Sequence, residues 1–165
     1  MEHGDHVALN YDLDAPLVEC TSIEDWKEKA KGHKVFVTPH HMGYQGGYRG
    51  YNWKCFTEGD ITPFVEMYSR HGLAESDQGD YPYLHDMGPR QWEGTIQYGL
   101  ELGNKFGIMA STDQHSGYPG SYGDGRIGVL APSLTRDAIW EALRTRHVCA
   151  ATGDKIIIDF RLNDA

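Results

Sequence analysis

Short apolar runs alternate with polar and glycine-containing stretches along the chain. The runs are rich in β-branched and aromatic side chains, a composition that is typical of buried strands. The stretch 156–162 is apolar at first and then alternates with polar residues, which predicts a final, antiparallel edge strand. The other predicted strands are residues 6–9, 34–38, 64–68, 107–110 and 127–130.

Three segments between these strands carry helix signals. A hydroxyl and a carboxylate three residues apart, at Thr21 and Glu24, form a capping-box pattern. Apolar residues at helical spacing follow Trp92, and Thr135 is placed as the N-cap of a third helix. Helices that alternate with strands in this way predict an α/β domain with mostly parallel strands.

Histidines and one aspartate follow three of the predicted strands within a few residues. In a parallel α/β sheet or barrel, residues just past the carboxyl ends of the strands converge on one rim, where such folds keep their active sites. Imidazole nitrogens and carboxylate oxygens are common ligands of divalent ions. The residues concerned are His40, His41, His71, Asp113 and His115.

Not every one of these side chains is expected to bind an ion directly. Adjacent side chains at a strand end point in opposite directions, so only one of His40 and His41 is predicted to be a ligand. Glu66, inside its strand, is predicted to point into the site or to support it as a buried carboxylate. His71 is placed in the same supporting tier, with a hydrogen bond to a loop carbonyl as the alternative. The remaining loop and helix-end histidines are interpreted as solvated or capping: His33, His85 and His147.

Composition narrows the classes of function. Fifteen Lys and Arg against 24 Asp and Glu give a formal charge of -9, which argues against a nucleic-acid-binding patch. No stretch approaches the roughly 18 apolar residues of a membrane span, and the N-terminus lacks the apolar segment of a signal peptide. Three scattered cysteines form neither a disulfide framework nor a zinc motif. The compartment stays open, with the cytoplasm favoured.

Two loops rich in glycine and tyrosine, residues 43–51 and 117–123, stand out. They are either ordinary turns or shaped loops that line a pocket. Arg49 and Arg126 lie in or beside these loops and are candidates to hold an anionic substrate. A non-catalytic alternative is a ligand- or glycan-binding module whose aromatic rings stack on a planar ligand. Those rings belong to Tyr44, Tyr48, Tyr51, Trp53, Tyr118 and Tyr122.

Four stretches carry a family resemblance: VTPHHMGY (37–44), VEMYSRHG (65–72), STDQHSGYPG (111–120) and ATGDK (151–155). In this order they resemble an uncharacterised group related to the PHP (polymerase and histidinol phosphatase) superfamily of metal-dependent phosphoesterases. The resemblance implies a distorted (β/α)7 TIM-like barrel with several divalent ions (zinc, manganese or iron) at its carboxyl rim. It also implies metal-ligand roles for His6, for His40 or His41, and for Asp113 and His115.

The chain departs from that family at its beginning. PHP proteins open with an H-x-H strand end and later supply a glutamate that bridges metals, and neither is evident upstream of His6. At 165 residues the chain resembles the C-terminal part of a barrel that usually needs about 250 residues. We therefore expect residues 1–165 to be a single PHP-like domain, truncated on its N-terminal side. Open sheet edges would then favour a homo-oligomer.

The predicted activity is hydrolysis of a small-molecule phosphoester by the complete protein, with the fragment's incomplete site lowering its own activity. Divalent ions would activate a water molecule and neutralise phosphoryl charge, and Asp113 and His115 are the predicted catalytic residues. The same chemistry serves metal-dependent amide hydrolases, which remain an alternative.

Overall fold

The computed structural model describes residues 3–15, 17–59, 61–78, 88–118, 121 and 124–163. Short 3₁₀ turns occupy Trp53–Cys55 and Trp92–Gly94. The α-helices of this part are α1 (Ile23–Lys29), α2 (Ile96–Glu101) and α3 (Arg136–Arg144). The strands are β1 (Asp5–Asn10), β2 (Val35–His40), β3 (Phe64–Ser69), β4 (Gly72–Leu73), β5 (Gly107–Ala110), β6 (Arg126–Val129) and β7 (Val148–Ala151).

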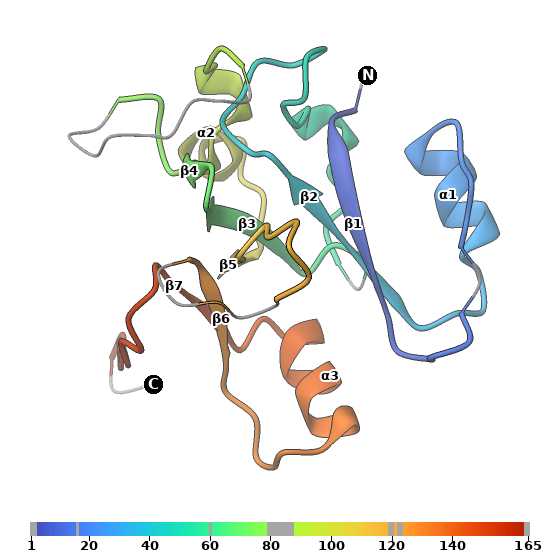
Figure 1. Cartoon of the computed structure of the whole chain (residues 1–165), viewed down its shortest axis with the longest axis vertical. Helices are drawn as coiled ribbons and strands as arrows, with labels where there is room; N and C mark the ends of the chain where they lie inside the picture. The colour runs from blue at the N-terminus through green and yellow to red at the C-terminus, as the bar shows by residue number, and fades with distance from the viewer. Residues whose placement is uncertain are drawn as a thin grey trace.

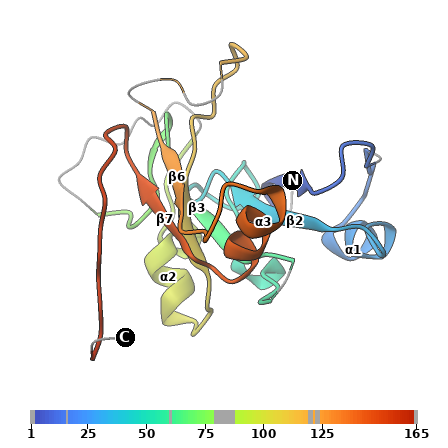
Figure 2. The same cartoon turned by 90° about the horizontal axis from the view of Figure 1, so that it is seen from below.

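The described strands form three small sheets: β1–β2, β4–β3–β5 and β6–β7. The sheets adjoin one another, so that β1, β2, β3, β5 and β7 follow each other across the molecule (Figures 1 and 2). The Val37 amide of β2 donates to the Ile61 carbonyl in the loop before β3 at 2.8 Å, and the Thr38 hydroxyl donates to the Phe64 carbonyl of β3 at 3.3 Å. This arrangement brings the ends of β2, β3 and β5 to one side of the molecule.

The predicted (β/α)7 barrel with mostly parallel strands is wrong. Among the described strands, β3 and β5 form the one parallel pair, while β1–β2, β3–β4 and β6–β7 are antiparallel. The three α-helices are only seven, six and nine residues long. Parallel barrels need a covering helix between successive strands. Here α1 lies between β1 and β2, and α3 between β6 and β7, yet both pairs are antiparallel, so these short helices do not carry the chain across to a parallel neighbour.

Most predicted elements are present, with shifted ends. The predicted strands up to residue 130 correspond to β1, β2, β3, β5 and β6, but 156–162 form no strand and β7 was not predicted. The first helix is capped by Ser22, which accepts from the Asp25 amide at 3.1 Å, rather than by Thr21. The helix predicted from Trp92 begins only after Thr95, whose hydroxyl accepts from the Tyr98 amide. None of the described helices has the length and apolar character needed for a membrane crossing.

Packed aromatic side chains hold the strands beneath the site. Phe36 of β2 stacks on Trp140 of α3 with ring centroids 3.9 Å apart, and it meets Phe64 of β3 edge to face. Under the loop that follows β2, Met42 packs with Trp53 in a second buried cluster. Fixed strands make the loops at their ends well-defined platforms for polar side chains.

Candidate metal centre

Three histidines surround one carboxylate oxygen at the ends of the central strands. Asp113 Oδ2 lies 2.9 Å from His71 Nε2, 3.4 Å from His40 Nε2 and 4.0 Å from His41 Nδ1. The side chains of Asp113 and His41 are only 8% and 5% exposed. His40 ends β2, His71 lies in the turn between β3 and β4, and Asp113 follows β5. The predicted convergence of these residues is therefore present, although the barrel is not.

Two of these residues have unusual backbone conformations. His41 has φ 59° and Asp113 has φ 45°, in the left-handed region that non-glycine residues rarely adopt. Such conformations cost on the order of 1–3 kcal/mol each and cluster at functional sites. At His41 the turn breaks strand alternation, so its ring lies beside that of His40 with centroids 3.7 Å apart. Both rings therefore face Asp113 and do not point in opposite directions, and the prediction that only one of the pair is a ligand stays a prediction.

Glu66 fixes the orientation of His40 from behind. Its Oε1 lies 3.1 Å from His40 Nδ1, and its Oε2 accepts a hydrogen bond from the Ser111 hydroxyl at 2.5 Å. A buried carboxylate that accepts the Nδ1 proton leaves His40 Nε2 directed toward Asp113. Histidines that bind metals commonly have such a carboxylate partner on the other ring nitrogen. Glu66 thus has the geometry of the supporting role, one of its two predicted roles.

The nitrogen and oxygen atoms of the cluster are arranged more like ligands of a divalent ion than like hydrogen-bond partners of one another. His41 Nδ1 and Asp113 Oδ2 are both buried without a hydrogen-bond partner among the described residues. One donor atom each from His40, His41 and Asp113 lies within 4.8 Å of the others. Two ligands of one ion, each about 2.1 Å from it, lie about 3.0–3.4 Å apart. Small inward movements of the side chains would reach those separations.

The charges within the cluster are strongly coupled. Burial disfavours protonation of His40, but Asp113 and Glu66 outweigh it and raise the pKa of His40 to about 10. Burial, with repulsion from His40, lowers the pKa of His41 to about 4. Burial would raise the pKa of Asp113, but His40, His71 and His41 hold it below its usual value. Without an ion, at neutral pH, His40 is therefore protonated and His41 is neutral.

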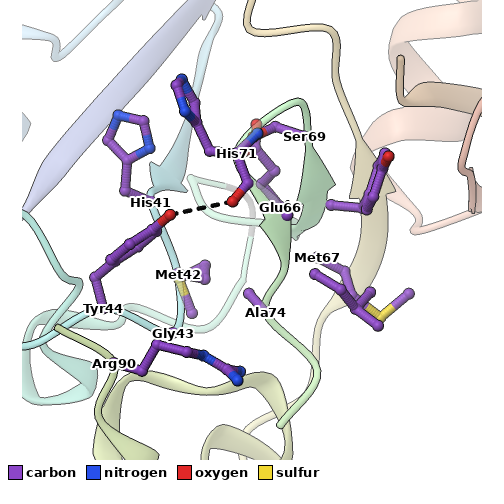
Figure 3. A pocket seen from close by; sticks show the side chains of 13 residues that line it. His41, Met42, Gly43, Tyr44, Glu66, Met67, Ser69, His71, Ala74 and Arg90 are labelled. Atoms are coloured by element: carbon purple, nitrogen blue, oxygen red, sulfur yellow. Dashed lines mark hydrogen bonds between the residues drawn. The ribbon is translucent and has the colours of Figure 1, made fainter. Parts of the chain in front are cut away.

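A small cavity of about 20 Å³ borders the cluster, and His41, Glu66 and His71 are among its lining residues. Figure 3 shows the rings of His41 and His71 at one end of it and Arg90 at the other. The Tyr44 hydroxyl donates to the His71 carbonyl at 3.1 Å and ties the loop after β2 to the turn after β3. The predicted supporting residues Glu66 and His71 thus both lie at the site.

Three predicted site residues lie outside the cluster. His6 hydrogen-bonds the Gly4 carbonyl at 3.2 Å and packs edge to face on Tyr51. The side chain of His115 is 82% exposed, with Nε2 3.5 Å from Asp113 Oδ1, and it is not one of the clustered ligands. Arg126 donates to the Gly153 and Ser121 carbonyls. His33 and His147 are exposed, as expected for solvated residues, whereas His85 lies outside the described residues.

Asp5 was not predicted and lies beside the cluster, although the clustered ligand atoms belong to His40, His41 and Asp113. Asp5 pairs with His40 across the β1–β2 ladder, and its Oδ2 lies 3.8 Å from His41 Nε2. Its neighbour His6 points to the other face because strand side chains alternate. Asp5 also lies 4.0 Å from Arg49 Nη1, which brings that predicted anion-binding residue to the edge of the cluster. The strand register, which was not predicted, decides which of Asp5 and His6 faces the cluster.

The aromatic loops offer a ligand little surface. Tyr44, Tyr51 and Trp53 are 6%, 2% and 5% exposed and belong to the core, so they are not available for stacking. Tyr48 and Tyr118 are 59% and 72% exposed, and Tyr122 lies outside the described residues. The structure therefore gives the ring-stacking module no continuous aromatic platform among the described residues.

Comparison with known proteins finds relatives whose names state no activity. Proteins named "Uncharacterized protein" from Chlamydia trachomatis serovar D and Chlamydia muridarum are 28% and 29% identical to the chain over 127 and 112 residues. The matches cover 70% and 61% of this chain but only 20% and 18% of those relatives, so the chain spans about a fifth of their length. No protein-family model and no solved structure matches the chain. The resemblance to the PHP superfamily thus stays a prediction.

Proposed function

We propose that this chain carries the metal centre of a metal-dependent hydrolase, and that phosphoester hydrolysis is its chemistry. The observation that supports the proposal most directly is the buried Asp113 Oδ2, which lies 2.9–4.0 Å from three imidazoles and has no hydrogen bond of good geometry among the described residues. His40, His41 and Asp113 would hold the ion, with His71 beside Asp113. A divalent ion in such a site lowers the pKa of a coordinated water and neutralises charge on phosphoryl oxygens.

The surrounding residues supply orientation and charge. Glu66 holds His40 with Nε2 toward the ion position. His115, exposed and 3.5 Å from Asp113, is placed to exchange a proton with solvent or with a leaving group. Arg49 is 46% exposed and lies next to Asp5 at the edge of the cluster, where its guanidinium could bind a phosphate in a bidentate manner. A cation at that edge favours an anionic substrate over a neutral amide.

Metal content tests the site itself. The chain is purified without chelator, dialysed against zinc or manganese and analysed by elemental mass spectrometry. We expect about one ion per wild-type chain and a loss of at least 10-fold in affinity for Asp113→Asn. Asn tolerates the left-handed backbone found at residue 113, so this change removes charge with little strain. The matched change His115→Ala should retain the ion, and equal, near-zero metal in all three proteins would refute the proposal.

Turnover of a chromogenic phosphomonoester and phosphodiester, beside an amide, tests the chemistry. We expect metal-dependent phosphoester hydrolysis that Asp113→Asn abolishes and that Arg49→Ala weakens mainly through KM. An ion-loaded chain that cleaves only the amide would overturn the substrate assignment. An ion-loaded chain that cleaves none of them would overturn the assignment of catalysis to this chain and leave a metal-binding site.

A further inference from the structure

The C-terminal segment 156–162 has the side-chain pattern of an amphipathic strand but forms no strand in the structure. Its alternate residues Ile156, Ile158, Phe160 and Leu162 would share one face of an extended strand, and all are more than half exposed. Ile156 donates its amide to the Asp154 carbonyl, and no backbone hydrogen bond joins residues 157–163 to any described residue. The segment therefore has the side-chain pattern of a strand, but from residue 157 onward its backbone amides and carbonyls form no backbone hydrogen bonds with the described residues.

β1 offers an unpaired edge and an adjoining cleft. β1 pairs with β2, and no described strand pairs with its other edge. His6 and Ala8 of β1, with Val18 and Trp26 opposite, line both a cleft of about 460 Å³ and a neighbouring one of about 370 Å³. An open strand edge beside an apolar cleft can accept an added strand. Backbone hydrogen bonds to the edge provide affinity, and the cleft binds every second side chain of the added strand.

We infer that the segment 156–162 of one copy of this chain adds to the β1 edge of a second copy, and that the exchange is reciprocal. An antiparallel register that places Arg161 opposite Asp5 also places Phe160 opposite His6 and Ile158 opposite Ala8. Arg161 then meets the opposite charge of Asp5, Asp159 lies opposite Val7, and the apolar face of the segment covers the cleft over Trp26. One register thus satisfies charge and apolar burial together.

The exchange takes place between copies because the two elements lie apart in one chain. Both views show the C-terminal segment beyond β6 and β7 and β1 beside α1 on the opposite side of the molecule (Figures 1 and 2). Ile156, Ile157 and Ile158 border a groove against β6 and β7, and the central strands separate that groove from β1. A second copy brings the two elements together without refolding either chain.

The test is size-exclusion chromatography with light scattering on the full chain from about 1 to 100 µM. We expect a species of twice the 18.6 kDa chain mass at the higher concentrations. Ile158→Asp places a charge on the apolar face and should weaken dimerisation at least 10-fold. Ile157→Asp, the same change at the neighbouring residue on the other face, should leave it unchanged. Both side chains are exposed, at 64% and 95%, so neither change threatens folding.

A labelled peptide of residues 154–163 tests the acceptor edge directly. It should bind the Ile158→Asp chain saturably, and the same peptide carrying Ile158→Asp should not bind. A wild-type chain that stays monomeric at 100 µM would overturn the inference. A dimer that survives Ile158→Asp, or that both substitutions disrupt equally, would overturn it as well, because the contact would then lie elsewhere or be unspecific.

Discussion

Glu66 is the residue whose role at the site is most sharply defined. It is buried, and its two oxygens contact His40 Nδ1 and the Ser111 hydroxyl. Glu66→Gln keeps the shape and an acceptor for His40 but removes the charge that makes the imidazole a stronger ligand. Supporting residues of this kind are worth about 10–100-fold in metal affinity. We expect Glu66→Gln to weaken zinc binding about 10-fold in a competition titration with a chromophoric chelator, and the exposed Glu101→Gln to leave it unchanged.

The protonation of His40 predicts how ion binding depends on pH. The pKa of His40 is raised to about 10 and that of His41 lowered to about 4, so at pH 8 His40 holds a proton that an ion must displace. The complex then binds fewer protons than the free protein, and affinity rises with pH up to about 10. Calorimetry at pH 8 in two buffers of different ionisation enthalpy should report about one proton released per ion. No proton release at that pH would contradict the assignment of His40 as a ligand.

At the level of residues, the sequence indicated where the candidate site lies but not which side chains form it. Histidines placed after strands were enough to select His40, His41 and Asp113, because the carboxyl ends of neighbouring strands meet whether or not a barrel closes. The left-handed conformation at His41 leaves no mark in the sequence, so strand alternation did not predict that both rings face Asp113. The choice between Asp5 and His6 depended on a strand register that local patterns do not determine.

At the level of elements, β5 was predicted with its observed ends, and β2 and β3 within a few residues. These strands are short, buried and bounded by turn residues, so their local signal is strong. The pairing was mispredicted because alternating strands and helices suggest crossovers, whereas the short helices here leave room for hairpins. The strand predicted at 156–162 is absent, because a local strand pattern does not supply the neighbouring strand that the segment would need and none of the described strands pairs with it.

Helix α2 packs so closely on the core that one added methyl group should disturb it. A Cβ at Gly99 would lie 2.2 Å from Cζ2 of Trp53, a buried ring whose Nε1 donates to the Thr95 carbonyl at 2.9 Å. Alanine gains about 1 kcal/mol over glycine in helix propensity, but overpacking costs about 1–3 kcal/mol. We expect Gly99→Ala to lower the free energy of unfolding by about 1 kcal/mol in urea titrations. Leu100→Ala, at an exposed neighbour, should change it far less, and a stabilised Gly99→Ala would contradict the packing.

At the level of the whole molecule, the candidate metal centre draws its residues from two adjoining sheets. Asp5 belongs to β1, His40 and His41 to the end of β2, and Asp113 to the loop after β5. An ion held by these segments would cross-link two of the three described sheets and give a ligand role to the buried Asp113 Oδ2, which has no hydrogen-bond partner among the described residues. Ion binding should therefore be visible as global stability and not only as a local change.

Thermal unfolding measures that linkage. A ligand at 100 times its Kd stabilises the folded state by about 2.7 kcal/mol, which corresponds to a rise of about 5–10 °C in Tm for a domain of this size. We expect that rise for the wild-type chain with zinc or manganese and its loss in Asp113→Asn, while Asp154→Asn, which removes an exposed carboxylate, behaves as wild type. Because all three proteins are exposed to the same ion, unspecific binding to this acidic surface would raise their Tm equally. Equal shifts would therefore locate the ion outside the cluster and leave the histidines without a cation to hold.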